Sequence, residues 1–283
     1  MKSRRQLPSG ELFDEISTYW AEIADANATE KQVDFVKNNI QPNGLVLDLG
    51  CGNGRHSVLL NKAGYKVVGL DISMRLLKLA KAKAVSIDAS AVWVRADMRF
   101  MPFCSGAFAA VVSLDSSFGY LHSEPEDLES ISEVFRVLRE NGVFLIDVFN
   151  GERMKNRYGR KPGSILRSLL FGLLPNFPQF ARLFKWREYP SFYLLQKRSV
   201  TDKGEKLRDL WIFRDKTTRK ITVSRHVVRL YSRGHLQTLL RKAGFQSLNV
   251  QGNYEGQEYA KDSSRLIAIA RKILNQRACQ LVS

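Results

Sequence analysis

Three glycines alternate with other residues directly after an apolar segment in the first quarter of the chain. The segment reads VLDLGCGNGRHSVLL, residues 46–60, and its glycines are Gly50, Gly52 and Gly54. Because glycine has no Cβ atom, a glycine-rich turn lets the backbone approach a bound cofactor closely. The pattern therefore indicates a cofactor site, and the question is which cofactor it accepts.

The spacing of these glycines differs from the two common nucleotide-binding patterns. The nicotinamide and flavin fingerprint is G-x-G-x-x-G, whereas here Arg55 stands where the third glycine is needed. The chain also has no G-x-x-x-x-G-K-S/T loop for a nucleoside triphosphate. Asp48, two residues before the first glycine, suits a cofactor without phosphate better than a pyrophosphate, which it would repel. An NAD-dependent oxidoreductase is the alternative.

Two more aspartates end the next two apolar segments. Asp71 ends residues 66–71 and Asp97 ends residues 91–97. A carboxylate after the second strand of a parallel sheet can accept hydrogen bonds from both ribose hydroxyls, and ligands bind at the carboxyl ends of such strands. Asp97 is in a position to bind an adenine amino group. The three aspartates together predict a site for an adenosine-containing cofactor.

These segments resemble the motifs of the class I S-adenosylmethionine (SAM)-dependent methyltransferases. VLDLGCGNG is similar to the first motif of that family, VVGLDIS to the second and RADMRFMPF to the third. The resemblance covers about residues 44–150 and is weaker over 233–271. It implies that Asp71 holds the ribose of SAM and that the adenine lies beside Asp97. The predicted SAM-binding residues are Asp48, Gly50, Cys51, Gly52, Gly54, Asp71, Ile72, Asp97, Met98, Leu114 and Tyr19.

The methyl acceptor is expected next to the segment SLDSSFGYLHSEPED, which follows the fourth strand. This segment lacks the N/D-P-P-F/Y motif of enzymes that methylate exocyclic base or glutamine nitrogens, and it lacks a Pro-Cys nucleophile. Asp115 could order or deprotonate an amine, or cap a turn. Tyr120 could line the acceptor pocket or pack in the core, and His122 could act as a base or lie in an exposed loop. We take Asp115, Tyr120 and His122 as the candidate catalytic residues and Ser117 as a further contact.

The other reactive side chains have plainer interpretations. His56 is expected to pack beside the glycine turn, and His226 and His235 to lie at the surface or serve structure. Tyr19 and Trp20 could close an N-terminal helix over SAM, as the family resemblance suggests, or simply be buried in the core. Cys51, Cys104 and Cys279 show no metal-ligand or disulfide spacing, so neither a metal site nor a disulfide framework is predicted.

The order of elements predicts the fold that positions these residues. Two helical segments are followed by alternating strands and helices up to residue 150, which is typical of a parallel sheet covered on both faces. Residues 164–187 are then apolar, aromatic and basic. Three antiparallel strands (191–200, 206–214 and 219–230), a helix (233–244) and two strands (245–251 and 264–271) follow. We predict a Rossmann-like α/β fold with a basic, β-rich insertion after the fifth strand, divided as 1–151, 152–232 and 233–283.

Nearly all of the excess positive charge lies in one segment. Residues 153–242 contain 23 Lys and Arg against five Asp and Glu, together with twelve aromatic residues. Such a segment favours an anionic partner. It could form a lid over a small anionic substrate, bind RNA through phosphate contacts and base stacking, or dock on an anionic membrane. The chain has no apolar run long enough to span a membrane and no secretory signal at its start, so we expect a cytoplasmic protein.

The predicted activity is methyl transfer from SAM to a nitrogen or oxygen nucleophile of a small, anionic metabolite. ADMRFMPF together with DSSFGYL resembles small-molecule N-methyltransferases related to the amino-sugar and glycine N-methylating enzymes. In those enzymes, strands inserted after the fifth strand help to build the acceptor pocket, a role that would suit the predicted insertion. Methylation of RNA, such as tRNA, or of a membrane lipid is the alternative within the same chemistry.

Overall fold

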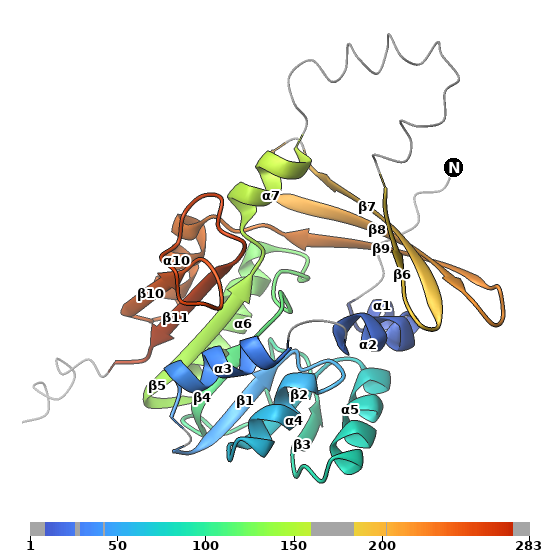
Figure 1. The fold of residues 1–283 in the computed structure, drawn as a ribbon. Coiled ribbons are helices and arrows are strands. Elements are labelled where there is room, and N and C mark those ends of the chain that lie inside the picture. The colour runs from blue at the N-terminus through green and yellow to red at the C-terminus, as the bar shows by residue number, and fades with distance from the viewer. Residues whose placement is uncertain (1–8, 26–28, 42, 160–183, 202, 274–283) are drawn as a thin grey trace, which may run out of the picture.

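The computed structural model describes residues 9–25, 29–41, 43–159, 184–201 and 203–273, which form a seven-stranded sheet, a separate four-stranded sheet and their helices (Figure 1). The strands are β1 (Leu45–Leu49), β2 (Lys66–Asp71), β3 (Val92–Arg95), β4 (Phe108–Ser113), β5 (Leu138–Val148), β6 (Lys185–Glu188), β7 (Phe192–Val200), β8 (Lys206–Asp215), β9 (Ile221–Arg229), β10 (Ser247–Gln251) and β11 (Leu266–Arg271). The helices are α1 (Ser9–Glu15), α2 (Ser17–Asp25), α3 (Thr29–Asn39), α4 (Arg55–Lys62), α5 (Met74–Ser86), α6 (Glu124–Val137), α7 (Gly151–Tyr158) and α10 (Arg233–Lys242).

The seven-stranded sheet has the order β10-β11-β5-β4-β1-β2-β3. Strands β1 to β5 run parallel, and β11 lies antiparallel between β5 and β10. From the middle of the sheet, β1, β2 and β3 follow one another toward one edge, whereas β4 and β5 follow one another toward the other edge. Loops that leave β1 and β4 therefore diverge, and a crevice forms between them at the carboxyl ends of the strands. The predicted Rossmann-like fold is confirmed.

Helices cover both faces of this sheet because its central strands are apolar on both sides. On one face, α6 and α10 pack Ile131, Val134, Leu236 and Leu240 against residues such as Phe144. On the other face, α3 and α4 contribute a second buried cluster, with Val33, Phe35, Val36 and Leu60 packed on β1, β2, β4 and β5. This two-sided core holds the strand ends rigidly, so the site at their carboxyl edge has a firm base.

The insertion forms an antiparallel sheet in the order β6-β7-β8-β9. Its last three strands match the predicted segments 191–200, 206–214 and 219–230, whereas β6 was not predicted. Most of the predicted apolar segment 164–187 lies outside the described residues. The inner face of this sheet packs on the N-terminal helices: Ile16 and Ile23 share a buried cluster with Phe192, Leu194, Trp211 and Phe213. The insertion is thus joined to the core through α1 and α2.

No helix among the described ranges combines the length and apolar character needed to cross a bilayer.

Candidate active site

The first of two adjoining cavities lies at the carboxyl ends of β1, β2 and β4 and encloses about 720 Å³, including its opening to solvent. Its walls combine the glycine turn, the strand-end aspartates and apolar side chains. The lining residues are Phe13, Trp20, Gly50, Gly52, Leu70, Asp71, Ile72, Leu76, Ala96, Asp97, Met98, Asp115, Ser116, Ser117, Tyr120 and Leu121. This mixture of bare backbone, carboxylates and apolar side chains suits a cofactor with both polar and apolar parts.

The glycine turn is held against β2 and leaves no room for a side chain at its first glycine. The backbone N–H groups of Gly50 and Cys51 both donate to the carbonyl of Leu70, at 2.8 and 3.0 Å. Gly50 has φ +72°, and a Cβ there would lie 2.7 Å from Cβ of Ser117. Any larger residue would be strained by this backbone conformation and would push on the loop after β4. The turn thus brings bare backbone to the cavity wall.

Asp71 lines the cavity and is fixed by the backbone around it. Its Oδ2 accepts a hydrogen bond from the N–H of Gly52 at 2.9 Å, and its Oδ1 accepts one from the N–H of Ser73 at 2.8 Å. Burial raises the pKa of Asp71, and these backbone bonds oppose that shift. The carboxylate is therefore oriented in advance and needs little reorganisation to accept hydrogen bonds from a ligand.

Asp97, Ile72 and Met98, three of the predicted cofactor residues, also line the first cavity. Arg99 donates from Nε and Nη2 to the Asp97 carboxylate, the shortest contact being 2.7 Å. Burial acts to raise the pKa of Asp97, but the bonds from Arg99 outweigh it and hold this pKa below its ordinary value. Asp97 is therefore ionised at the cavity wall, where it can accept from a ligand N–H.

Five predicted cofactor residues do not line this cavity: Asp48, Cys51, Gly54, Leu114 and Tyr19. Asp48 is buried behind the turn and accepts from Ser57 Oγ at 2.5 Å. The side chain of Cys51 is also buried, and the position of a Cβ on Gly54 is occupied by Trp93 and Ala80. These residues support the turn from behind.

Leu114 and Tyr19 also lie outside the lining of the first cavity. Leu114 is buried, and its carbonyl accepts a hydrogen bond from Ser117 Oγ at 2.8 Å. The Tyr19 ring stacks on Phe213 of the insertion, with 4.5 Å between ring centroids. The residues of α1 and α2 that do line the first cavity are Phe13 and Trp20.

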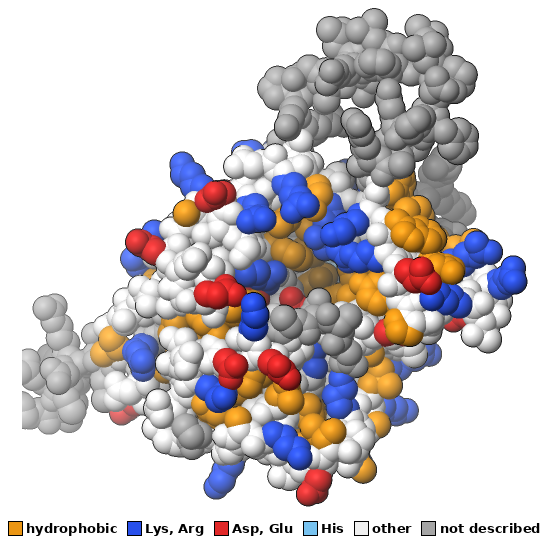
Figure 2. Space-filling view, in the orientation of Figure 1, with side chains coloured by type: hydrophobic (Ala, Val, Ile, Leu, Met, Phe, Trp, Pro, Cys, Tyr) orange, Lys and Arg blue, Asp and Glu red, His pale blue; other side chains and the backbone are white. Residues whose placement is uncertain are grey.

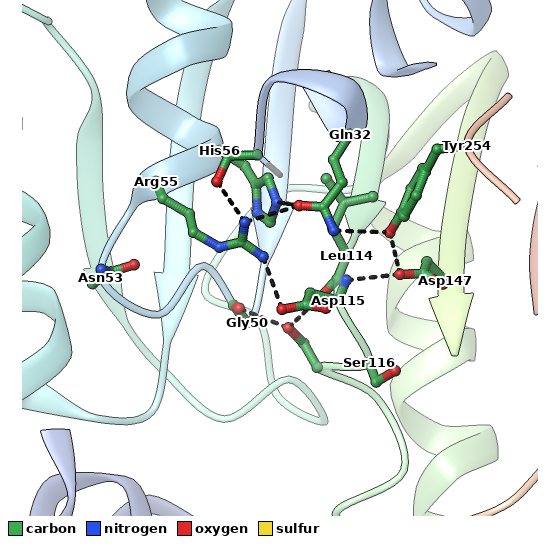
Figure 3. A network of polar contacts seen from close by, with 12 residues as sticks. Gln32, Gly50, Asn53, Arg55, His56, Leu114, Asp115, Ser116, Asp147 and Tyr254 are labelled. Atoms are coloured by element: carbon green, nitrogen blue, oxygen red, sulfur yellow. Dashed lines mark hydrogen bonds and ion pairs between the residues drawn. The ribbon is translucent and has the colours of Figure 1, made fainter. Parts of the chain in front are cut away.

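A buried arginine holds Asp115, the candidate catalytic carboxylate (Figure 3). Arg55 Nη2 donates to Asp115 Oδ2 at 2.8 Å, while its Nη1 donates to Thr29 and Gln32. Asp115 has φ +53°, an uncommon conformation for a residue other than glycine. Arg55 thus has a role that the sequence pattern did not reveal, since the pattern showed it only as a substitute for a glycine.

A second buried ion pair lies beneath the same loop. Arg265 donates from Nε and Nη2 to Asp147, at 2.7 and 2.6 Å, and Tyr254 Oη also donates to Asp147. Asp147 Oδ2 in turn accepts from the N–H of Asp115 at 2.9 Å (Figure 3). The sequence analysis identified neither Asp147 nor Arg265, because their roles depend on a contact across 118 positions of sequence.

The second cavity encloses about 710 Å³ between the core and the inner face of the insertion. It shares Trp20, Asp115 and Tyr120 with the first cavity, so the two meet at these side chains. Its lining residues are Trp20, Ile23, Asp115, Tyr120, Phe149, Arg187, Arg198, Asp209, Trp211, His226 and Val228. Asp115 and Tyr120 therefore lie at the junction of the two cavities.

The histidines differ from expectation at two positions. His122, predicted as a candidate base, is exposed and lines neither cavity; its backbone N–H donates to Glu126. His226, predicted to be superficial or structural, is buried and lines the second cavity. The alternation of Ser224, His226 and Val228 on one face of a strand was the signal that could have identified it. His56 packs beside the turn as expected, with its Nε2 at 2.7 Å from Gln32 Oε1.

The described residues include no cluster of three or more His, Cys, Asp or Glu side chains arranged to hold a metal ion.

Known methyltransferases resemble this chain in sequence and in fold. Residues 46–142 match the family model of a methyltransferase domain. The chain is 32% identical to a glycine/sarcosine N-methyltransferase of Parasynechococcus marenigrum over 51% of this chain and 52% of that protein, so it spans about half of that relative.

Two solved structures share nearly the whole fold. The CcbJ methyltransferase from Streptomyces caelestis has a TM-score of 0.74 at 15% identity, over 94% of this chain and 98% of that one. SAM-bound CalS10, an amino pentose methyltransferase from Micromonospora echinaspora, has a TM-score of 0.61 at 16% identity, over 95% and 100%. Residues 46–142 therefore match a methyltransferase domain, and the chain shares the fold of these solved methyltransferases.

Proposed function

We propose that this protein transfers the methyl group of SAM to a nitrogen or oxygen nucleophile of a small, anionic molecule. The observation that carries the proposal is the meeting of the two cavities at Trp20, Asp115 and Tyr120. One cavity has the features of a SAM site and the other adjoins it, so a donor and an acceptor can face each other at this junction.

The residues of the first cavity fit SAM. The bare backbone at Gly50 and Gly52 admits a close-lying chain, and the Asp71 and Asp97 carboxylates match ribose hydroxyls and an adenine amino group. Apolar side chains such as Leu76 and Met98 complete the wall and exclude water. Bound SAM supplies a methyl group on a sulfonium, and the task of the chain is to align a nucleophile with it.

The side chains at the junction suit alignment better than proton removal. Burial raises the pKa of Tyr120 well above its ordinary value, so its hydroxyl stays neutral and acts as a hydrogen-bonding group. Asp115 is paired with Arg55 and offers a fixed acceptor to an N–H or O–H of the substrate. We therefore infer that an amine acceptor reacts as the free base, with Asp115 orienting it.

Several similar proteins carry names that specify methylation of nitrogen or of an amino sugar, which favours a nitrogen acceptor. Among them are the glycine/sarcosine N-methyltransferase and structures of amino pentose and sugar N-methyltransferases. Inserted strands also form one wall of the second cavity here, as expected from the resemblance.

Binding of SAM tests the cofactor part of the proposal. Calorimetry should show SAM binding that Asp71→Ala weakens by at least about tenfold, because the ribose hydroxyls lose a charged hydrogen-bond acceptor. Asp34→Ala is the matched control, since Asp34 is exposed on α3 and lies outside both cavities. Equal affinity for SAM in the wild type and the Asp71 variant, or binding of NADH in place of SAM, would refute the assignment.

Transfer of label from SAM tests the acceptor class. The protein is incubated with methyl-labelled SAM and separate small-molecule, lipid and RNA fractions of a cell extract. Label is expected in the small-molecule fraction, because the second cavity lies between the core and the insertion and is lined by polar and aromatic side chains. Label confined to RNA or lipid would contradict this part of the proposal and favour docking through the basic insertion.

A further inference from the structure

Polar atoms without partners mark the second cavity as a ligand site. Trp211 Nε1 and both ring nitrogens of His226 are buried and have no hydrogen-bond partner. The exposed fractions of these side chains are 7% and 4%, and both residues line the cavity. An unsatisfied buried polar group is costly, and native proteins keep few of them without a reason. A bound polar molecule would supply the missing partners.

The register of the inserted sheet aligns these groups. Arg198, Asp209 and His226 face one another across β7, β8 and β9, and Trp211 lies on the same face two residues after Asp209. The Asp209 carboxylate accepts from Gln196 Nε2 and Arg198 Nε and makes no hydrogen bond to His226. Both ring nitrogens of His226 are thus left without a partner in a residue that lines the cavity.

His226 can recognise a ligand through hydrogen bonds, but its ring carries no charge near neutral pH. Burial, reinforced by the nearby Arg198 guanidinium, lowers the pKa of His226 to about 4, so its ring is neutral near pH 7. A neutral imidazole presents one donor and one acceptor. With the Trp211 donor beside it, this wall matches a ligand group that both gives and receives hydrogen bonds, such as a hydroxyl or an uncharged amine.

Positive charge gathers at the opposite end of the cavity. Arg187 on β6 lines it and has no carboxylate partner among the described residues. The pKa of the neighbouring Lys185 is lowered, first by repulsion from Arg187 and then by burial and by Arg157 and Arg198. Figure 2 shows Lys and Arg side chains gathered on this part of the surface.

We propose that the second cavity binds an extended anionic acceptor, with its anionic group on Arg187 and a hydroxyl or amine on His226 and Trp211. This inference rests on the proposed methyltransferase function and specifies its substrate. Arg187 and His226 stand on the two outer strands of a four-stranded sheet. They are three strand spacings or roughly 14 Å apart across the sheet, and four residues or roughly 13 Å apart along it. A ligand that contacts both is longer than a simple amino acid, so glycine itself should not be a substrate.

Three variants and one control test the acceptor site. Arg187→Gln removes the cation, His226→Phe removes both ring nitrogens, and His226→Gln keeps a donor and an acceptor. Arg225→Gln is the control, because Arg225 is an exposed cation on β9 directly before His226 and lines neither cavity. Each protein is given methyl-labelled SAM and a small-molecule extract, and the labelled products are separated on an anion-exchange resin.

The wild type and Arg225→Gln should label a product that the resin retains. Arg187→Gln and His226→Phe should form it at least about tenfold more slowly, and His226→Gln should recover part of the loss. SAM affinity, measured by calorimetry, should stay within about twofold in all four variants, since none of these side chains lines the first cavity. The isolated product, added with S-adenosylhomocysteine, should shift the imidazole ¹⁵N resonances of His226.

Other results would overturn the inference. A labelled product that the resin does not retain, labelling of added glycine, or wild-type rates in Arg187→Gln and His226→Phe would each refute the acceptor site while methyl transfer stands. If the wild type binds no SAM or labels no small molecule, the proposed function fails and this inference fails with it.

Discussion

Asp48 shows at the scale of one residue how burial changes chemistry. It is 1% exposed, and Ser57 Oγ donates to it at 2.5 Å. Burial raises the pKa of Asp48 to about 6, although the bond from Ser57 and the charge of Arg55 act against that shift. The side chain supports the glycine turn from behind, and its ionisation near neutral pH is a cost to the folded state.

Replacing Asp48 with asparagine should therefore remove a pH-dependent loss of stability. Between about pH 4 and pH 6 the folded state binds more protons at Asp48 than the unfolded state does, so stability falls as pH rises through this window. Above pH 6 the loss is complete, at about 3 kcal/mol. Urea unfolding of the wild type and Asp48→Asn at pH 5 and pH 8 should show the variant gaining relative stability at the higher pH.

SAM affinity serves as the control for the Asp48→Asn variant. Asp48→Asn should keep the SAM affinity of the wild type, because Asp48 does not line the cavity. A relative stability that is the same at both pH values would show that Asp48 does not titrate in this range.

At the scale of elements, the site depends on hydrogen bonds that join the loop after β4, the end of β5 and the start of β11. The loop after β4 contains two successive residues with positive φ, Asp115 and Ser116, and both contact Asp147 at the end of β5. Arg265, just before β11, closes the arrangement by donating to Asp147 and to Ser116 Oγ. The loop thus keeps an uncommon backbone conformation because buried charged groups fix it.

Breaking this ion pair from one side should destabilise the fold strongly. Arg265→Leu leaves the Asp147 carboxylate buried without its cation, which should cost about 3–5 kcal/mol of unfolding free energy in denaturant titrations. The double variant Asp147→Asn with Arg265→Leu should recover part of that loss, since it leaves no unpaired charge. A double variant no more stable than Arg265→Leu alone would show that the two side chains do not act as a pair.

At the scale of the whole molecule, charge is divided between two regions. Residues 153–242 carry 23 of the 44 Lys and Arg but five of the 28 Asp and Glu. Part of this charge is internal, since Arg198 pairs with Asp209 and Arg229 with Asp127. Arg187 faces the second cavity. Most of the other described Lys and Arg side chains in this region are exposed. Arg187 is thus placed to meet a small anionic acceptor, while the exposed cations make a basic surface.

Binding of polyanions tests this division of charge. At low salt, tRNA and vesicles rich in anionic lipid should both bind weakly, because a basic surface attracts any polyanion. Near 0.15 M salt, where screening acts over about 8 Å, both should be released. Gel shifts and vesicle sedimentation at graded salt measure this. Binding of either partner that persists at this salt would favour the macromolecular alternative.

The sequence by itself determined the donor side of this protein. Gly50, Asp71 and Asp97 could be placed because each sits at a strand end, a position set by local turn chemistry and by the chain order of the strands. Only the tertiary structure revealed the second cavity, which we propose as the acceptor side. Arg55 meets Asp115 across 60 positions, and His226 faces the cavity because of the register of β7 to β9. Such contacts depend on packing between distant segments, which no local pattern records.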